Sequence, residues 1–203
     1  MPDTLYLNLW WPSFTEAEML ARVECVLRQF PFSQTHPGIG YFAVHSVSWN
    51  EPIISQQTFD DQATPQQAVA LAGEFLHDDN GYIFEAAWDL WSPGRQYDSW
   101  SEQPHTVKFL VHGSNFEDGV ANESGHVQID FGADSDFLFD EVELTEIGQQ
   151  RVKENIARLV SFSATIEKNC GISARLLWSE SEENLAQKLI TRLQHRGVWN
   201  NPR

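Results

Sequence analysis

Alternation of apolar and polar residues predicts β-strands in several parts of the chain. Residues 4–10 have leucine at every second position, which is typical of a strand with one buried face. Residues 40–49 have a similar pattern, and residues 53–59 are expected to extend that strand beyond Pro52. A further short strand is expected over residues 174–178.

Four other segments have apolar residues every three or four positions, which predicts amphipathic helices. The first follows Thr15 and Glu18, a pair in which each side chain binds a backbone amide at the helix start. In the second, Thr64 is the expected cap and Pro65 occupies the first turn, where a missing amide costs nothing. The helices are expected to begin near residues 15, 64, 145 and 181.

The middle of the chain predicts a meander of three strands. The segments 82–91, 106–112 and 126–131 have strand character, and no helical pattern separates them. Consecutive strands joined by loops most simply pair antiparallel. The connections 92–105 and 113–125 are polar and are expected to be long loops.

The order of elements favours one α+β domain over residues 1–203. We expect a single, mostly antiparallel sheet with about four helices packed on it, ferredoxin-like in part. No apolar run approaches the roughly 18 residues of a membrane helix. The chain is long enough to bury a core without metal or disulfide staples.

Charge narrows the range of expected partners. The 203 residues include 29 acidic residues and 13 Lys or Arg, a formal net charge of −16. Residues 1–147 carry a net charge of −20 and residues 148–203 carry +4. Such an acidic body disfavours nucleic acids and anionic membranes and would attract a basic protein. The alternative is that the acidity serves solubility and the basic segment packs against the acidic body.

One face of the predicted meander collects candidate catalytic residues. Histidine next to carboxylates suits either acid–base chemistry or transition-metal binding. The alternative is the solvated outer face of a one-sided sheet, which also needs polar residues at alternate positions. The candidates are His112, His126, Glu85, Asp89 and Asp130, with Lys108 on the same face.

Sequence motifs support no cofactor. The acidic stretch that begins at Asp134 has Phe139 and Thr145 where a calcium-binding EF-hand needs Gly and Glu. Zinc-protease, phosphate-loop, dinucleotide and serine-hydrolase motifs are also missing from the sequence. We therefore expect neither a metal nor a cofactor.

An aromatic stretch is the candidate interface. Trp91, Arg95, Tyr97 and Trp100 lie close together in the sequence, and these residue types dominate binding hot spots. The alternative is that the rings pack on the core of the domain itself.

The two cysteines and the start of the chain suggest a cytoplasmic protein. Cys25 and Cys170 have no neighbouring Cys or ligand-spaced His, so two ordinary free thiols are expected. The first residues contain Asp3 and lack the basic region of a signal peptide.

Two functional hypotheses follow. The first is a non-catalytic cytosolic interaction protein with an acidic surface, for example an immunity- or inhibitor-like protein that neutralises a basic partner. The second is a small-molecule or metal-dependent enzyme that uses the His/carboxylate face. Charge and aromatic residues favour the first, because catalytic signatures are missing from the sequence. The oligomeric state stays open.

Overall fold

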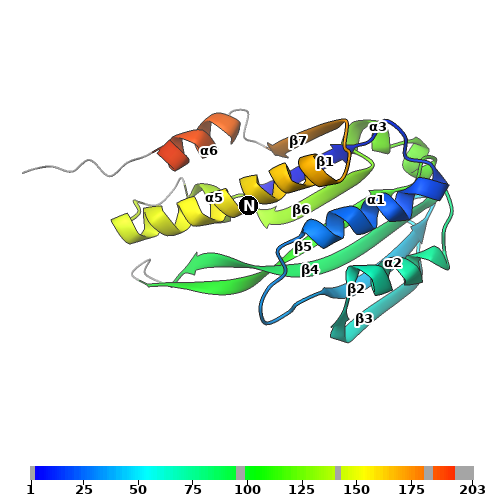
Figure 1. Ribbon diagram of the computed structural model, residues 1–203, viewed down its shortest axis with the longest axis horizontal. Coiled ribbons are helices and arrows are strands. Elements are labelled where there is room, and N and C mark those ends of the chain that lie inside the picture. Colours follow the sequence, from blue (N-terminus) through cyan, green and yellow to red (C-terminus); the bar gives the residue numbers. More distant parts are fainter. Residues whose placement is uncertain (1–2, 95–98, 140–142, 181–184, 195–203) are drawn as a thin grey trace, which may run out of the picture.

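A computed structural model describes residues 3–94, 99–139, 143–180 and 185–194. Seven strands form one antiparallel sheet with the order β3-β2-β4-β5-β6-β1-β7 (Figure 1). The strands are β1 (Thr4–Trp10), β2 (Ile39–Ser46), β3 (Ile53–Ala63), β4 (Asn80–Pro93), β5 (Trp100–His112), β6 (Val127–Ala133) and β7 (Ala174–Ser179).

The helices α1, α2 and α5 lie over one face of this sheet (Figure 1). Among the described residues, no helix is both long enough and apolar enough to span a membrane. The helices are α1 (Glu16–Gln29), α2 (Pro65–Gly73), α3 (Ala121–Ser124), α4 (Ser135–Leu138), α5 (Glu146–Asn169) and α6 (Leu185–Gln194), with a 3-10 turn η1 (Phe116–Asp118).

The core fills the space between the helices and the sheet. Alternate residues of each central strand point to the helices, so Leu5, Leu7 and Leu9 of β1 are fully buried. Phe30, at the end of α1, packs edge-on against Phe109 of β5. Burial of these apolar side chains is the main force that holds the two layers together.

The predicted α+β architecture is confirmed, and so is the meander. β4, β5 and β6 are neighbours in one sheet, and each pair is antiparallel. α1 begins after Thr15 with the expected capping box to Glu18, and α2 begins after Thr64 with Pro65 in its first turn. The last helix was expected to be capped by Ser181 or Ser179; Ser181 lies outside the described residues, and Ser179 is the last residue of β7.

Two local predictions were wrong. Residues 53–59 do not extend the preceding strand; they turn back as β3 and pair antiparallel with β2. Residues 92–105 are not one long loop, because β4 continues to Pro93 and β5 begins at Trp100. In this region β4 and β5 form a two-stranded ribbon. The ribbon tolerates polar residues because part of its surface is exposed to solvent.

A buried asparagine of α5 holds the β4–β5 ribbon against the helical layer. Asn155 is fully buried, and its side chain accepts a hydrogen bond from the Trp91 N–H at 2.8 Å. Its amide donates to the Trp91 carbonyl at 2.9 Å. The side chain thus satisfies both backbone groups of a β4 residue that lies beyond the pairing with β2.

The expectation of two free thiols was also wrong. Cys25 of α1 and Cys170 at the end of α5 form a disulfide, with their Cα atoms 5.7 Å apart. The two residues are 145 positions apart, so only the packing of α1 beside α5 brings them together. The cysteines therefore no longer support the expected reducing compartment.

Candidate functional site

The sheet face opposite the helices presents a continuous row of polar and aromatic side chains. Strand register aligns one residue from each of the seven strands, and alternation directs them away from the core. From β3 to β7, this open-face row contains Thr58, Tyr41, Glu85, Lys108, Asp130, Tyr6 and Trp178. At the β7 end, the rings of Tyr6 and Trp178 stack with their centroids 4.9 Å apart.

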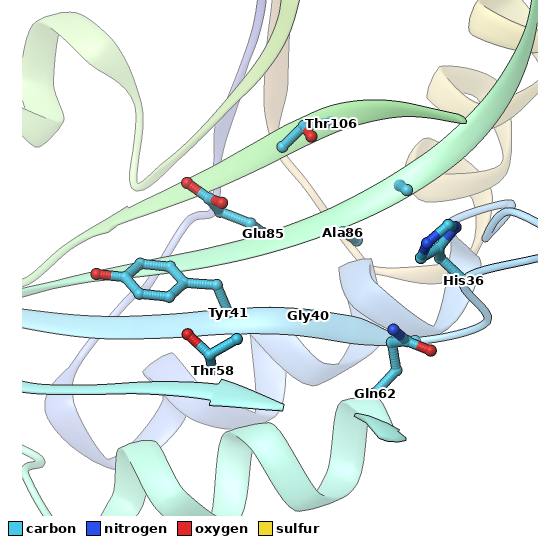
Figure 2. Close-up of a pocket in the computed structure, with 10 residues that line it drawn as sticks. His36, Gly40, Tyr41, Thr58, Gln62, Glu85, Ala86 and Thr106 are labelled. Atoms are coloured by element: carbon cyan, nitrogen blue, oxygen red, sulfur yellow. The ribbon is translucent and has the colours of Figure 1, made fainter. Parts of the chain in front are cut away.

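A groove of about 470 Å³ lies at the β2 end of the row. Figure 2 shows Tyr41, Glu85 and Thr58 on one side of the groove and His36 with Gln62 on the other. Gly40 lies between these two groups, where the strand carries no side chain. Gly38, Ala86, Ala87 and Thr106 complete the lining.

Irregular strand pairing creates this groove. Gly40 is an extra residue in β2, because Ile39 pairs with Ala86 of β4 and Tyr41 pairs with the preceding Glu85. On the other side, β3 bulges between the partners of Ile39 and Tyr41. A Cβ atom on Gly40 would meet no heavy atom closer than 4.0 Å, so close packing does not explain the glycine. The bulges instead leave an open floor.

Glu85 provides negative charge at the groove. Burial, followed by the charge of Glu85, raises the pKa of Tyr41, whose hydroxyl donates to Gln56 at 3.0 Å. On the opposite flank, Lys108 Nζ lies 3.8 Å from Glu85 Oε1, and half of the Lys108 side chain is exposed. An exposed ion pair this long adds about 0–1 kcal/mol, so Glu85 remains available to a ligand.

A second carboxylate lies beyond the His36 end of the groove. Asp89 accepts a hydrogen bond from the backbone N–H of Gln34 at 2.9 Å. Burial opposes ionisation of Asp89, but hydrogen bonds from Ser33 and Gln34, with the charges of Arg158 and His36, lower its pKa overall. Asp89 is therefore ionised at neutral pH and adds to the negative potential on this side of the sheet.

The structure places the two candidate histidines outside the groove. His112 is buried at the end of β5, and its Nδ1 donates to the Gly125 carbonyl at 2.7 Å. His126 precedes β6, accepts a hydrogen bond from the Trp11 N–H through Nδ1 at 3.0 Å, and stacks on Phe14. Burial lowers the pKa of both imidazoles. Both rings thus have structural contacts, and both are neutral at pH 7.

Of the five candidate catalytic residues, only Glu85 lines the groove. Asp130 lies in the open-face row opposite Lys108, and its carboxylate accepts the Gly132 N–H at 2.8 Å. The predicted arrangement of Glu85, Lys108 and Asp130 on one face agrees with the register, whereas His112 and His126 lie at the end of the sheet. A catalytic role for these residues stays a prediction.

The aromatic stretch makes contacts within the protein. Trp100 packs edge-on against Phe139 at 5.4 Å, and its indole also lies against Gly148 of α5. The guanidinium of Arg151 lies 3.6 Å from the centre of the Trp91 ring. Arg95 and Tyr97 lie outside the described residues. The contacts of Trp91 and Trp100 agree with the core-packing alternative, and their use as an interface stays a prediction.

Sequence reasoning missed a Ser-His-Asp chain. Ser92 Oγ lies 2.8 Å from His105 Nε2, and His105 Nδ1 lies 3.2 Å from Asp136 Oδ2. These atoms follow the order of a nucleophile, a base and an acid. Ser92 lies within the paired β4–β5 ribbon, and none of the three residues lines the groove. We interpret these contacts between Ser92, His105 and Asp136 as a structural link between the β4–β5 ribbon and α4.

Sequence reasoning also missed most of the groove. The pattern Gly38-x-Gly40 at the start of a predicted strand was the available signal, because glycine inside a strand often marks a bulge. Tyr41 and Thr58 had no recognisable motif, and their alignment with Glu85 depends on strand order.

Elsewhere among the described residues, the side chains of His77, Asp78 and Asp79 lie close enough together to hold one metal ion. They are consecutive, solvent-accessible residues of one turn, and such acidic turns are common without an ion.

The chain has no significant match to a protein-family model, to a curated protein or to a solved structure.

Proposed function

We propose that the protein is a non-catalytic interaction protein that binds a basic protein partner on the open face of its sheet. The observation that carries this proposal is the open-face row with its groove, on the side of the sheet opposite α1, α2 and α5. An immunity- or inhibitor-like role towards a basic toxin or nuclease is one form of this function.

The charge of the sheet supports the proposal of a basic partner. Within the bounds of β1 to β6 there are six acidic residues and one Lys or Arg, which is Lys108. The basic residues of α5 are partly neutralised, since Arg158 pairs with Glu102 and Arg151 pairs with Glu154. With Arg175 of β7 added, the sheet still has more acidic than basic residues, so its net negative charge would attract a basic partner.

Aromatic residues supply contact area in the same row. Tyr6, Tyr41 and Trp178 are half-buried, so part of each ring is accessible to a partner. Tyrosine and tryptophan are enriched at binding hot spots because they bury a large apolar area with few rotatable bonds. Charge would guide the approach of the partner, and these rings would lengthen its residence time.

A cytoplasmic location stays part of the proposal. The same negative charge disfavours anionic membrane surfaces and nucleic acids as partners. A stable Cys25–Cys170 disulfide in protein isolated from its host would argue for an oxidising compartment instead.

The test compares Glu85→Lys, on the open face, with Glu74→Lys, which makes the same charge change at the end of α2. Each protein captures partners from the native host, and the partner is identified, purified and measured for affinity. We expect one basic partner that binds the wild type and Glu74→Lys equally and binds Glu85→Lys at least about tenfold more weakly.

Equal binding to both variants would place the interface elsewhere and overturn the proposal. So would a partner with an acidic contact surface, or the lack of any partner that distinguishes the two variants. Amide spectra of both variants check that each substitution leaves the fold intact.

A further inference from the structure

We propose that the groove beside Gly40 binds an arginine side chain, which the basic partner supplies. This inference uses the proposed function only for the source of the arginine; the site itself is argued from its lining. The groove presents a carboxylate, an aromatic ring, two hydroxyls and an amide around a floor without a side chain. These groups belong to Glu85, Tyr41, Thr58, Thr106 and Gln62.

The carboxylate and the ring suit a planar cation. A guanidinium has several N–H donors in one plane and can bind both oxygens of a carboxylate such as Glu85. The same plane stacks on an aromatic ring, and Tyr41 is the register partner of Glu85 on the next strand. A lysine ammonium is a point charge without this plane, so it would use the groove less completely.

The hydroxyls and the amide extend the set of acceptors. Thr58 pairs with Tyr41 on β3, and Thr106 lies on β5 opposite Ala87. Adjacent strands lie about 4.8 Å apart, so Thr106, one strand from Glu85, and Thr58, two strands from it, both lie within the reach of one arginine and its flanking backbone. The groove volume of about 470 Å³ is in the usual range for a ligand of this size.

The competing cation inside the protein is weakly held. Lys108 approaches Glu85 from the side of β5 at 3.8 Å, and its side chain is half exposed. It lies outside the lining of the groove. An arginine that enters over Gly40 therefore reaches the Glu85 carboxylate from the other side and replaces a long ion pair with direct hydrogen bonds.

The experiment titrates the isotopically labelled full-length protein with a capped Gly-Arg-Gly peptide and follows amide chemical shifts. Matched peptides carry lysine, or carry citrulline, which has the shape of arginine without its charge. We expect saturable shifts at Gly40, Tyr41 and Glu85 with millimolar affinity for the arginine peptide. Binding of the lysine peptide is expected to be several-fold weaker, and the citrulline peptide should cause no saturable shift.

Variants separate the groove from the general charge of the face. Glu85→Gln keeps the size of the side chain and should weaken the arginine peptide about tenfold or more. Gly40→Leu should have a similar effect by filling the floor while Glu85 remains. Asp130→Asn removes the same charge from the same face outside the groove, and it should leave the affinity within about twofold.

No saturable shift at the groove up to about 20 mM peptide, well above a millimolar dissociation constant, would overturn the inference. Equal effects of Asp130→Asn and Glu85→Gln would also overturn it, because they would indicate diffuse charge attraction. If the arginine peptide binds at the groove but the partner binds the wild type and Glu85→Lys equally, only the proposed function is refuted. If partner binding requires Glu85 but the arginine peptide does not bind, only the arginine site is refuted.

Discussion

His112 occupies an enclosed position at the end of β5, between a backbone carbonyl and two aromatic rings. Its Nδ1 donates to Gly125, and the rings of Trp49 and Phe116 lie 5.7 and 6.2 Å away. A protonated imidazole would lose its hydration here, and so burial lowers the pKa of His112 below its ordinary value of 6.5. His112, which suggested acid–base chemistry in the sequence, therefore makes contacts that stabilise the fold.

This environment makes stability depend on pH. The unfolded chain protonates His112 near pH 6.5, whereas the folded protein keeps the ring neutral to a lower pH. The unfolded state thus binds more protons in this window, and the free energy of unfolding falls as the pH drops below about 6.5. One such group contributes at most about 1.4 kcal/mol per pH unit.

The prediction is measured by urea unfolding between pH 8 and 5. His112→Asn keeps a donor for Gly125, and it should reduce the pH slope below pH 6.5 relative to the wild type. At pH 8 both side chains are neutral, so the difference there reports only lost packing and serves as the internal reference. An unchanged slope in the variant would show that folding does not lower the pKa of His112.

At the scale of elements, the helical layer is tied together by one covalent link. α1 and α5 are adjacent in space but lie at opposite ends of the chain, and Cys25–Cys170 joins them across 145 residues. A cross-link over such a long loop restricts the unfolded chain and stabilises the folded state, typically by about 2–4 kcal/mol. Reduction should therefore loosen the contact between α1 and α5.

We expect no free thiol in the denatured, unreduced protein, and a fall of about 2–4 kcal/mol in the free energy of unfolding when a reductant is added. Thiol titration and chemical denaturation measure the two quantities. The double variant Cys25→Ser/Cys170→Ala is the matched control and should not respond to the reductant. Two titratable thiols in the unreduced wild type would contradict the link.

At the scale of the whole molecule, the distribution of charge differs between the sheet and the helical layer. The sheet carries most of its charge as carboxylates, whereas residues 148–203, which include most of α5, strand β7 and α6, have a net charge of +4. The helical layer covers the other face of the sheet (Figure 1). The basic partner that we propose would thus be attracted more to the open face than to the helical layer.

The salt dependence of partner association follows from this polarity. The Debye length shortens from about 10 Å at 0.1 M salt to about 3 Å at 1 M, so the field that guides a basic partner is screened. We expect the association rate constant to fall steeply over this range while the dissociation rate constant changes little. Stopped-flow or surface-binding kinetics with the identified partner measure both. An association rate that does not change with salt would contradict the electrostatic part of the proposal.

Local sequence determined the identity of most elements. Thr15 with Glu18 and Thr64 with Pro65 satisfy backbone amides within a single turn, so the starts of α1 and α2 were predictable from neighbouring residues. The meander was predictable for a similar reason, because strands close in sequence lose little entropy when they pair. The face shared by Glu85, Lys108 and Asp130 followed from alternation along those strands.

Only the tertiary structure decided the position of β1 between β6 and β7 and the pairing of Cys25 with Cys170. Both depend on contacts between distant parts of the chain, which local patterns do not encode. The groove also depends on contacts between distant parts of the chain. Glu85 was recognisable as a polar residue on one face, but it gained Tyr41 and the open floor at Gly40 through the register and bulges of β2 against its neighbours. A single residue shift in that register would direct Tyr41 into the core, so long-range packing decides where the site lies.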